Sequence, residues 1–168
     1  MIKEKILTRK NVLVASEFAT LFAIAVAAPL FKQQFITGPI VNSALLLSAI
    51  FLSFENAVLI ALLPSLIALS VGLLSPVLLP MIPFIIAGNI VYIYVFKQTQ
   101  KTNYWLAILL ASLLKFAFIF GASQFLVGII VQKQLPAPVA LMMSWPQLVT
   151  ALAGGIIAFL VLKTLKKV

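Results

Sequence analysis

Residues 104–131 read YWLAILLASLLKFAFIFGASQFLVGIIV and contain a single charged residue, Lys115. A helix needs about 20 apolar residues to cross the hydrocarbon core of a bilayer. This stretch is longer, so we expect a membrane-spanning helix that tilts or protrudes. The whole chain shares this character, since 64% of its 168 residues are hydrophobic, 9% are charged and the mean hydropathy is +1.22. Soluble domains carry about 25% charged residues, so the composition indicates an all-α membrane protein.

Charged residues, prolines and turn residues divide the sequence into six stretches of this kind. They predict one domain, residues 1–168, folded as a bundle of six transmembrane helices. The expected spans are Val12–Phe31, Gly38–Phe54, Asn56–Leu74, Val77–Phe96, Tyr104–Val131 and Val139–Leu162. An even number of spans places both termini on the same side of the membrane.

The distribution of lysine and arginine predicts which side that is, because these residues are enriched in cytoplasmic loops. Two basic residues, Lys32 and Lys133, lie on the side opposite to the termini. Nine lie on the side of the termini: Lys3, Lys5, Arg9, Lys10, Lys97, Lys101, Lys163, Lys166 and Lys167. We therefore expect a multi-pass protein of the plasma membrane with cytoplasmic termini. The net charge of +9 then reports orientation, and no nucleic-acid partner is expected.

The sequence is poor in residues that carry out chemistry. It has no His, Cys or Asp, and its three acidic residues are Glu4, Glu17 and Glu55. This composition excludes disulfides, thiolate or imidazole metal sites, and nucleophiles activated by histidine. We expect no catalytic residue, no metal and no cofactor, and therefore a protein that is not an enzyme.

Polar residues inside the spans are the best indication of function, because they are costly in lipid. Asn42, Asn89 and Gln147 follow proline-containing helix starts on the outer side, Gln124 lies near the outer end of its span, and Trp145 precedes Gln147. We expect these five residues to line an outward-facing pocket for a small molecule. The alternative is structural: the amides bond neighbouring helices, and the tryptophan lies at the membrane interface.

Lys115 is expected near the middle of the membrane, since eleven residues into a helix correspond to about 16 Å. An unpaired charge at that depth costs several kcal/mol. Two explanations are open. Lys115 forms an ion pair with Glu17 inside the bundle, or it meets an anionic group of the substrate at the floor of the pocket.

The first span carries small residues at every fourth position: Ala15, Ala19, Ala23 and Ala27. Such stripes let helices approach closely. Six spans in a chain of this length, cytoplasmic termini and this stripe resemble the S component, the substrate-capture subunit of energy-coupling factor (ECF) transporters. The runs PIVNSAL at 39–45 and SWPQLVTALAGG at 144–155 resemble a branch of that family whose substrate is not assigned.

The resemblance implies capture of a vitamin-like micronutrient near the outer face. It also implies docking of the alanine stripe on a membrane-embedded T component, with ATP used by two partner ATPase subunits. This chain has no Gly-xxxx-Gly-Lys-Ser/Thr loop for nucleotide phosphates. The alternatives are a self-sufficient secondary transporter or channel, and a structural subunit of a membrane complex.

Overall fold

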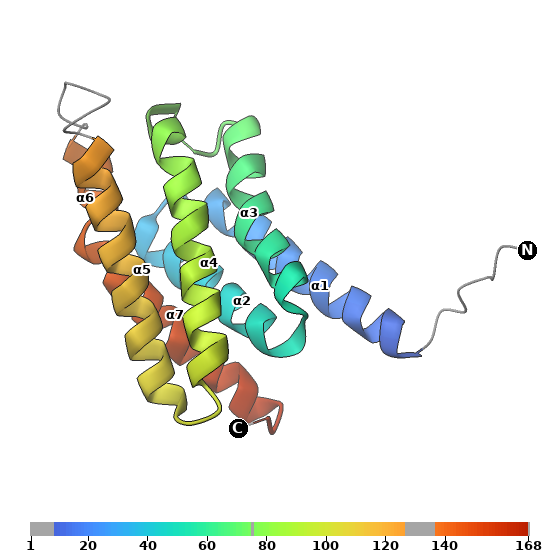
Figure 1. Cartoon of the computed structure of the whole chain (residues 1–168). Coiled ribbons are helices and arrows are strands. Elements are labelled where there is room, and N and C mark those ends of the chain that lie inside the picture. Colours follow the sequence, from blue (N-terminus) through green and yellow to red (C-terminus); the bar gives the residue numbers. More distant parts are fainter. Residues whose placement is uncertain (1–8, 75, 127–136, 168) are drawn as a thin grey trace, which may run out of the picture.

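The computed structural model describes residues 9–74, 76–126 and 137–167. Most of these residues are helical, and none of them forms a β-strand (Figure 1). The elements are α1 (Arg9–Ala27), the 3-10 helix η1 (Ala28–Phe31), α2 (Gln34–Phe51), α3 (Phe54–Ser70), the 3-10 helix η2 (Pro76–Met81), α4 (Ile82–Thr99), α5 (Tyr104–Leu126), α6 (Ala137–Met142) and α7 (Trp145–Thr164). The expected all-α class is confirmed.

Five segments are long and apolar enough to cross a membrane, which indicates a membrane protein. They are Arg9–Phe31, Gln34–Phe51, Leu78–Thr99, Tyr104–Phe125 and Trp145–Thr164. The expected span Asn56–Leu74 is the shorter helix α3, whose 17 residues extend about 25 Å at 1.5 Å per residue. The chain leaves α3 through Gly72, whose φ of 74° is a left-handed conformation that glycine adopts without steric cost. A count of six spans therefore remains a prediction.

Prolines set several helix boundaries differently from the predicted spans. The last span, Val139–Leu162, is two helices, because Pro146 lies in the first turn of α7 and a proline disfavours helical backbone in the residue before it. Similarly, α4 begins at Ile82 rather than Val77, with Pro83 in its first turn. By contrast, α2 begins at Gln34 rather than Gly38, so Pro39 lies inside the helix.

The other boundaries also shift. The first span is α1 followed by η1, with Pro29 in the first turn of η1. The break after α2 is at Leu52 and Ser53, where the Ser53 hydroxyl caps α3 by accepting a hydrogen bond from the Asn56 amide at 3.3 Å. The predicted end of the fifth span, residues 127–131, lies outside the described residues.

Helix α2 is in the middle of the bundle and packs against α1, α3, α4 and α7. Its buried residues include Asn42 and every residue from there to Ala49. Two glycines bring α7 against α2: a methyl group on Gly38 would lie 2.6 Å from Thr150, and one on Gly154 would lie 2.5 Å from Asn42. Without these glycines the two helices could not approach so closely.

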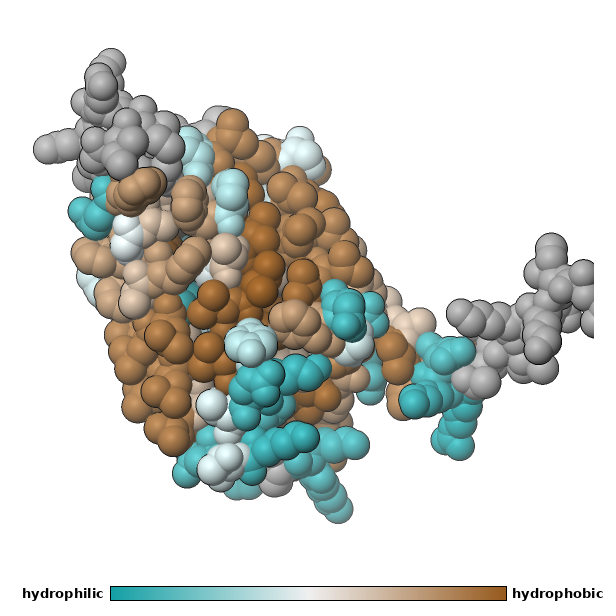
Figure 2. All heavy atoms as spheres, viewed as in Figure 1, coloured by the Kyte–Doolittle hydropathy of each residue, from teal (hydrophilic) through white to brown (hydrophobic). Residues whose placement is uncertain are grey.

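The surface has the polarity of a protein immersed in lipid. Large apolar side chains are exposed along α5, including Trp105, Leu109 and Leu113. Figure 2 shows hydrophobic residues over most of this face and hydrophilic ones gathered toward the end where α4 and α7 end. The connection between α4 and α5 and the end of α7 lie at that end, while the connection between α3 and α4 and helix α6 lie at the opposite end (Figure 1).

Candidate functional site: a polar cavity around Lys115

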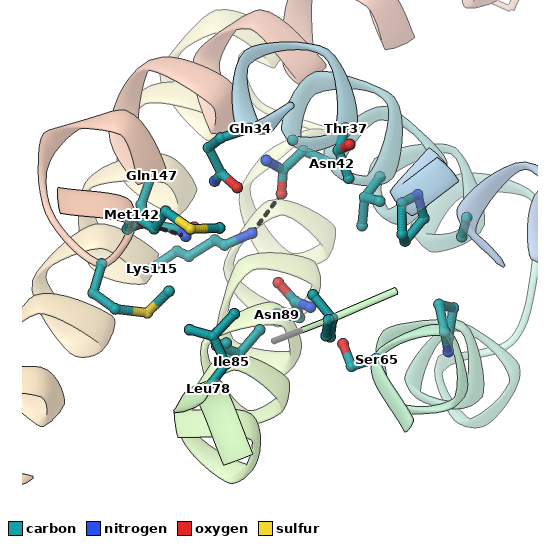
Figure 3. A pocket seen from close by; sticks show the side chains of 17 residues that line it. Gln34, Thr37, Asn42, Ser65, Leu78, Ile85, Asn89, Lys115, Met142 and Gln147 are labelled. Atoms are coloured by element: carbon teal, nitrogen blue, oxygen red, sulfur yellow. Dashed lines mark hydrogen bonds between the residues drawn. The ribbon is translucent and has the colours of Figure 1, made fainter. Parts of the chain in front are cut away.

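A cavity of about 120 Å³ lies inside the bundle, at the end away from the C-terminus. Its walls come from α1, η1, α2, α3, η2, α4, α5 and the α6–α7 junction. Figure 3 shows Gln34, Asn42, Asn89, Lys115 and Gln147 directed toward this common space. The short elements η1, η2 and α6 lie at this end of the bundle, and each contributes to the lining of the cavity.

Lys115 is the one basic residue among the described residues that line the cavity, and it is only 3% exposed. It donates a hydrogen bond to Oδ1 of Asn42. It also lies 5.0 Å from the centre of the Tyr92 ring, within the range at which a cation is attracted to an aromatic face. These partners orient the lysine and are neutral, and no acidic residue lines the cavity among the described residues.

Helix packing fixes both partners of Lys115. Tyr92 is buried in α4, and its hydroxyl donates a hydrogen bond of 2.7 Å to the carbonyl oxygen of Ala151 in α7. Asn42 is held by the close approach of Gly154. The ammonium group is therefore placed by α2, α4 and α7 together, although the lysine itself belongs to α5.

The amides near Lys115 have unused hydrogen-bonding capacity. Asn89 is 4% exposed, lines the cavity, and its side chain has no hydrogen-bond partner among the described residues. Gln147 uses its Nε2 to donate a 2.9 Å hydrogen bond to the Met142 carbonyl, which fixes α6 against the start of α7. Its side-chain oxygen makes no described hydrogen bond. Asn89, Gln147 and the NH₂ group of Asn42 therefore remain able to bind a guest molecule.

A second cavity of about 300 Å³ adjoins the first and includes Lys32 and Gln33 in its lining. Both cavities are lined by Pro29, Gln34, Thr37, Leu74, Leu78 and Met142. Together they form a funnel that is wider toward the connection between η1 and α2 and narrower toward Lys115. The Thr37 hydroxyl donates a 3.0 Å hydrogen bond to the Ala28 carbonyl and fixes the wall at this point.

The structure brings together four of the six predicted pocket residues: Asn42, Asn89, Lys115 and Gln147 line the cavity. The other two lie outside its lining. Gln124 is exposed on α5, because nine residues from Lys115 correspond to half a turn around the helix. Trp145 is 53% exposed and packs against Phe35 with ring centres 5.7 Å apart.

Sequence reasoning missed Gln34, Thr37, Ser65 and Met142, which also line the cavity. The predicted spans Val12–Phe31 and Gly38–Phe54 leave Gln34 in the connection between them. Its helical spacing to Gly38 and Asn42 would have placed it on the same face, had α2 been extended toward the N-terminus.

The predicted pair between Glu17 and Lys115 is not formed. Glu17 lines a separate groove of about 550 Å³ between α1, α2 and the end of α7. On another side of α1, the predicted docking residues Ala15, Ala19, Ala23 and Ala27 are exposed. Helix α1 instead packs into the bundle through other residues, Leu21 and Ala25 among them.

Comparison with known proteins identifies no relative: no family model, curated protein or solved structure matches the chain.

Proposed function

We propose that the chain captures a small molecule, as the S component of an ECF-type importer. The observation that carries the proposal is the cavity around Lys115, where buried polar groups with unused hydrogen-bonding capacity face a space inside an apolar bundle. Polar groups in such surroundings are costly unless they are paired. A guest that pairs them offsets that cost, which makes the site suited to binding.

The funnel also has a direction that suits uptake. It opens at the end of the bundle opposite to the C-terminus and to the α4–α5 connection. The excess of lysine and arginine at the other end favours a cytoplasmic location for that end. The proposed protein thus resides in the plasma membrane with its funnel facing outward, where it takes a vitamin-like micronutrient.

The exposed alanine face of α1 supports the second part of the proposal, docking on a T component whose two ATPase partners supply the energy. Alanines at every fourth position leave a smooth surface against which another membrane helix can pack closely. Since Ala19 and Ala23 are exposed, larger side chains at these positions would obstruct a partner and leave the bundle intact.

Substrate capture is tested by purifying the chain in mild detergent and identifying co-purifying small molecules by mass spectrometry. We expect a small molecule that stays bound through gel filtration, and no uptake by the chain alone in proteoliposomes. Uptake without partner subunits would favour a self-sufficient transporter, and a preparation free of any small molecule would contradict the proposal.

Docking is tested by co-expressing the chain with the T component and ATPases of its own organism. The double variant Ala19→Leu/Ala23→Leu should lose co-purification with the T component and keep its melting temperature. Ala117→Leu, at an exposed position of α5, is the matched control and should assemble normally. Normal assembly of the double variant would refute docking through this face.

A further inference from the structure

We infer that the ligand of this cavity is a small monocarboxylate whose carboxylate group binds Lys115, an inference that rests on the proposed capture function. The starting point is the balance of charge in the chain. The sequence has three acidic residues, Glu4, Glu17 and Glu55. Glu17 lines the groove beside α1, Glu55 is exposed at the start of α3, and Glu4 lies outside the described residues.

No described residue that lines the cavity carries a negative charge, whereas Lys115 carries a positive one. A buried cation requires a counter-charge, because neutral partners repay only part of the cost of removing it from water. Asn42 and Tyr92 are such neutral partners. An anionic molecule that enters the cavity would supply this counter-charge and keep the lysine protonated.

The neighbouring donors fit a carboxylate in particular. An ionised carboxylate only accepts hydrogen bonds, and its two oxygens together offer about four acceptor positions. Lys115 can donate to one oxygen, while the amide NH₂ groups of Asn89 and Asn42 are available to the other. Figure 3 shows these three side chains around the same part of the cavity. Lys115 is the one basic residue among the described lining of the narrow cavity and matches a single negative charge there, while Lys32 lines the adjoining wider cavity.

The volume of the cavity and its apolar lining indicate the size and character of the ligand beyond its carboxylate group. The space of about 120 Å³ corresponds to about four water molecules at roughly 30 Å³ each, which limits the part of the ligand beside Lys115 to a small group. The wall contains Leu78, Ile85, Met142 and Met143. These side chains suit a short aliphatic or aromatic body that extends from the carboxylate toward the wider cavity.

The test compares carboxylates with matched neutral compounds. Purified protein in detergent is titrated with a panel of small monocarboxylates, benzoate and hexanoate among them, and with the primary amide of each. Binding is followed by melting temperature and by calorimetry. For the best carboxylate we expect an affinity about tenfold or more above that of its amide, because hydrogen bonds to charged groups are the stronger ones.

Two variants locate the effect at Lys115. Lys115→Met removes the charge and keeps much of the side-chain length, and it should abolish the preference for carboxylate. Lys163→Met removes one positive charge from an exposed position at the end of α7 and should keep the preference.

Three results would overturn the inference: wild-type protein binding amides as tightly as carboxylates, no carboxylate of the panel binding, or a full preference surviving in Lys115→Met. None of these three would by itself overturn capture, because capture is judged by the molecule that co-purifies. A neutral co-purifying molecule would thus refute the carboxylate alone, whereas a preparation without any bound molecule would refute the proposed function.

Discussion

The close contact between α2 and α7 at Gly154 can be tested directly by mutation. It also matters for the site, because it holds Asn42 beside Lys115. A methyl group on Gly154 would lie 2.5 Å from Cβ of Asn42 and 2.9 Å from the backbone nitrogen of Ser43. Carbon atoms in good contact are about 3.5–4.0 Å apart. In Gly154→Ala the two helices would therefore have to separate by about 1 Å, and a backbone atom cannot rotate away as a side chain can.

The expected magnitude follows from two opposing effects. Overpacking costs about 1–3 kcal/mol, while alanine is favoured over glycine inside a helix by at most about 1 kcal/mol. We expect Gly154→Ala to lower the free energy of unfolding by about 1–2 kcal/mol. For a chain of this size that corresponds to a melting temperature lower by about 2–8 °C. Because the strain falls on Asn42, ligand affinity should fall as well.

The assay is thermal unfolding in detergent, with two matched glycine variants. Gly121 has no neighbouring atom within 4 Å in the described structure, so Gly121→Ala should be as stable as wild type or slightly more stable. The atoms nearest to a methyl group on Gly155 belong to the side chain of Ile108, at 2.6–2.9 Å, and a side chain can shift more easily than the Ser43 backbone that Gly154 faces. Gly155→Ala should therefore fall between the other two. If Gly154→Ala is as stable as Gly121→Ala, the close contact between α2 and α7 is wrong.

Three further variants probe the surroundings of the cavity and the start of α3. Lys115→Met should not lower the melting temperature of the empty protein, since replacing buried charge by apolar groups is often neutral or stabilising by about 1–4 kcal/mol; a marked loss of stability would show that Lys115 is structurally paired. Tyr92→Phe keeps the ring beside the ammonium group and removes the hydrogen bond to Ala151, so thermal unfolding should show a loss of about 1 kcal/mol with the carboxylate preference retained. Ser53→Ala removes the bond to the Asn56 amide and should cost about 1 kcal/mol, seen as faster hydrogen exchange in the first turn of α3; unchanged exchange there would contradict the capping role.

The helical class was predictable because hydropathy depends on composition and length, which a single sequence contains. The helix boundaries near prolines could not be predicted from the sequence alone. The predicted span Val139–Leu162 begins seven residues before Pro146, which lies in the first turn of α7, whereas the span predicted from Gly38 places Pro39 at a helix start, and Pro39 lies inside α2. A proline is tolerated in the first turn and can be accommodated inside membrane helices. Its effect is therefore decided by the neighbouring helices.

The residues that line the cavity could be predicted from the sequence only where a polar residue lies deep within an apolar helix. Asn42, Asn89 and Lys115 are polar residues deep in apolar helices, and each lines the cavity. Gln124 satisfies the same criterion of polarity but is exposed on α5. Whether a polar residue of α5 faces the cavity depends on the rotation of the helix about its own axis. That rotation is fixed by the packing of α5 against α4 and α7.

The uncompensated charge of Lys115 connects the stability of this protein with its function. The chain places a cation among neutral groups and provides no described acid beside it. A methionine at this position would satisfy packing without that electrostatic cost, and the proposed capture of an anion gives the lysine a role that methionine could not fill. Under this proposal the ligand stabilises the protein, since any molecule that binds only the folded state raises its stability. The same charge that makes the empty protein less stable thereby favours an anion over its neutral amide.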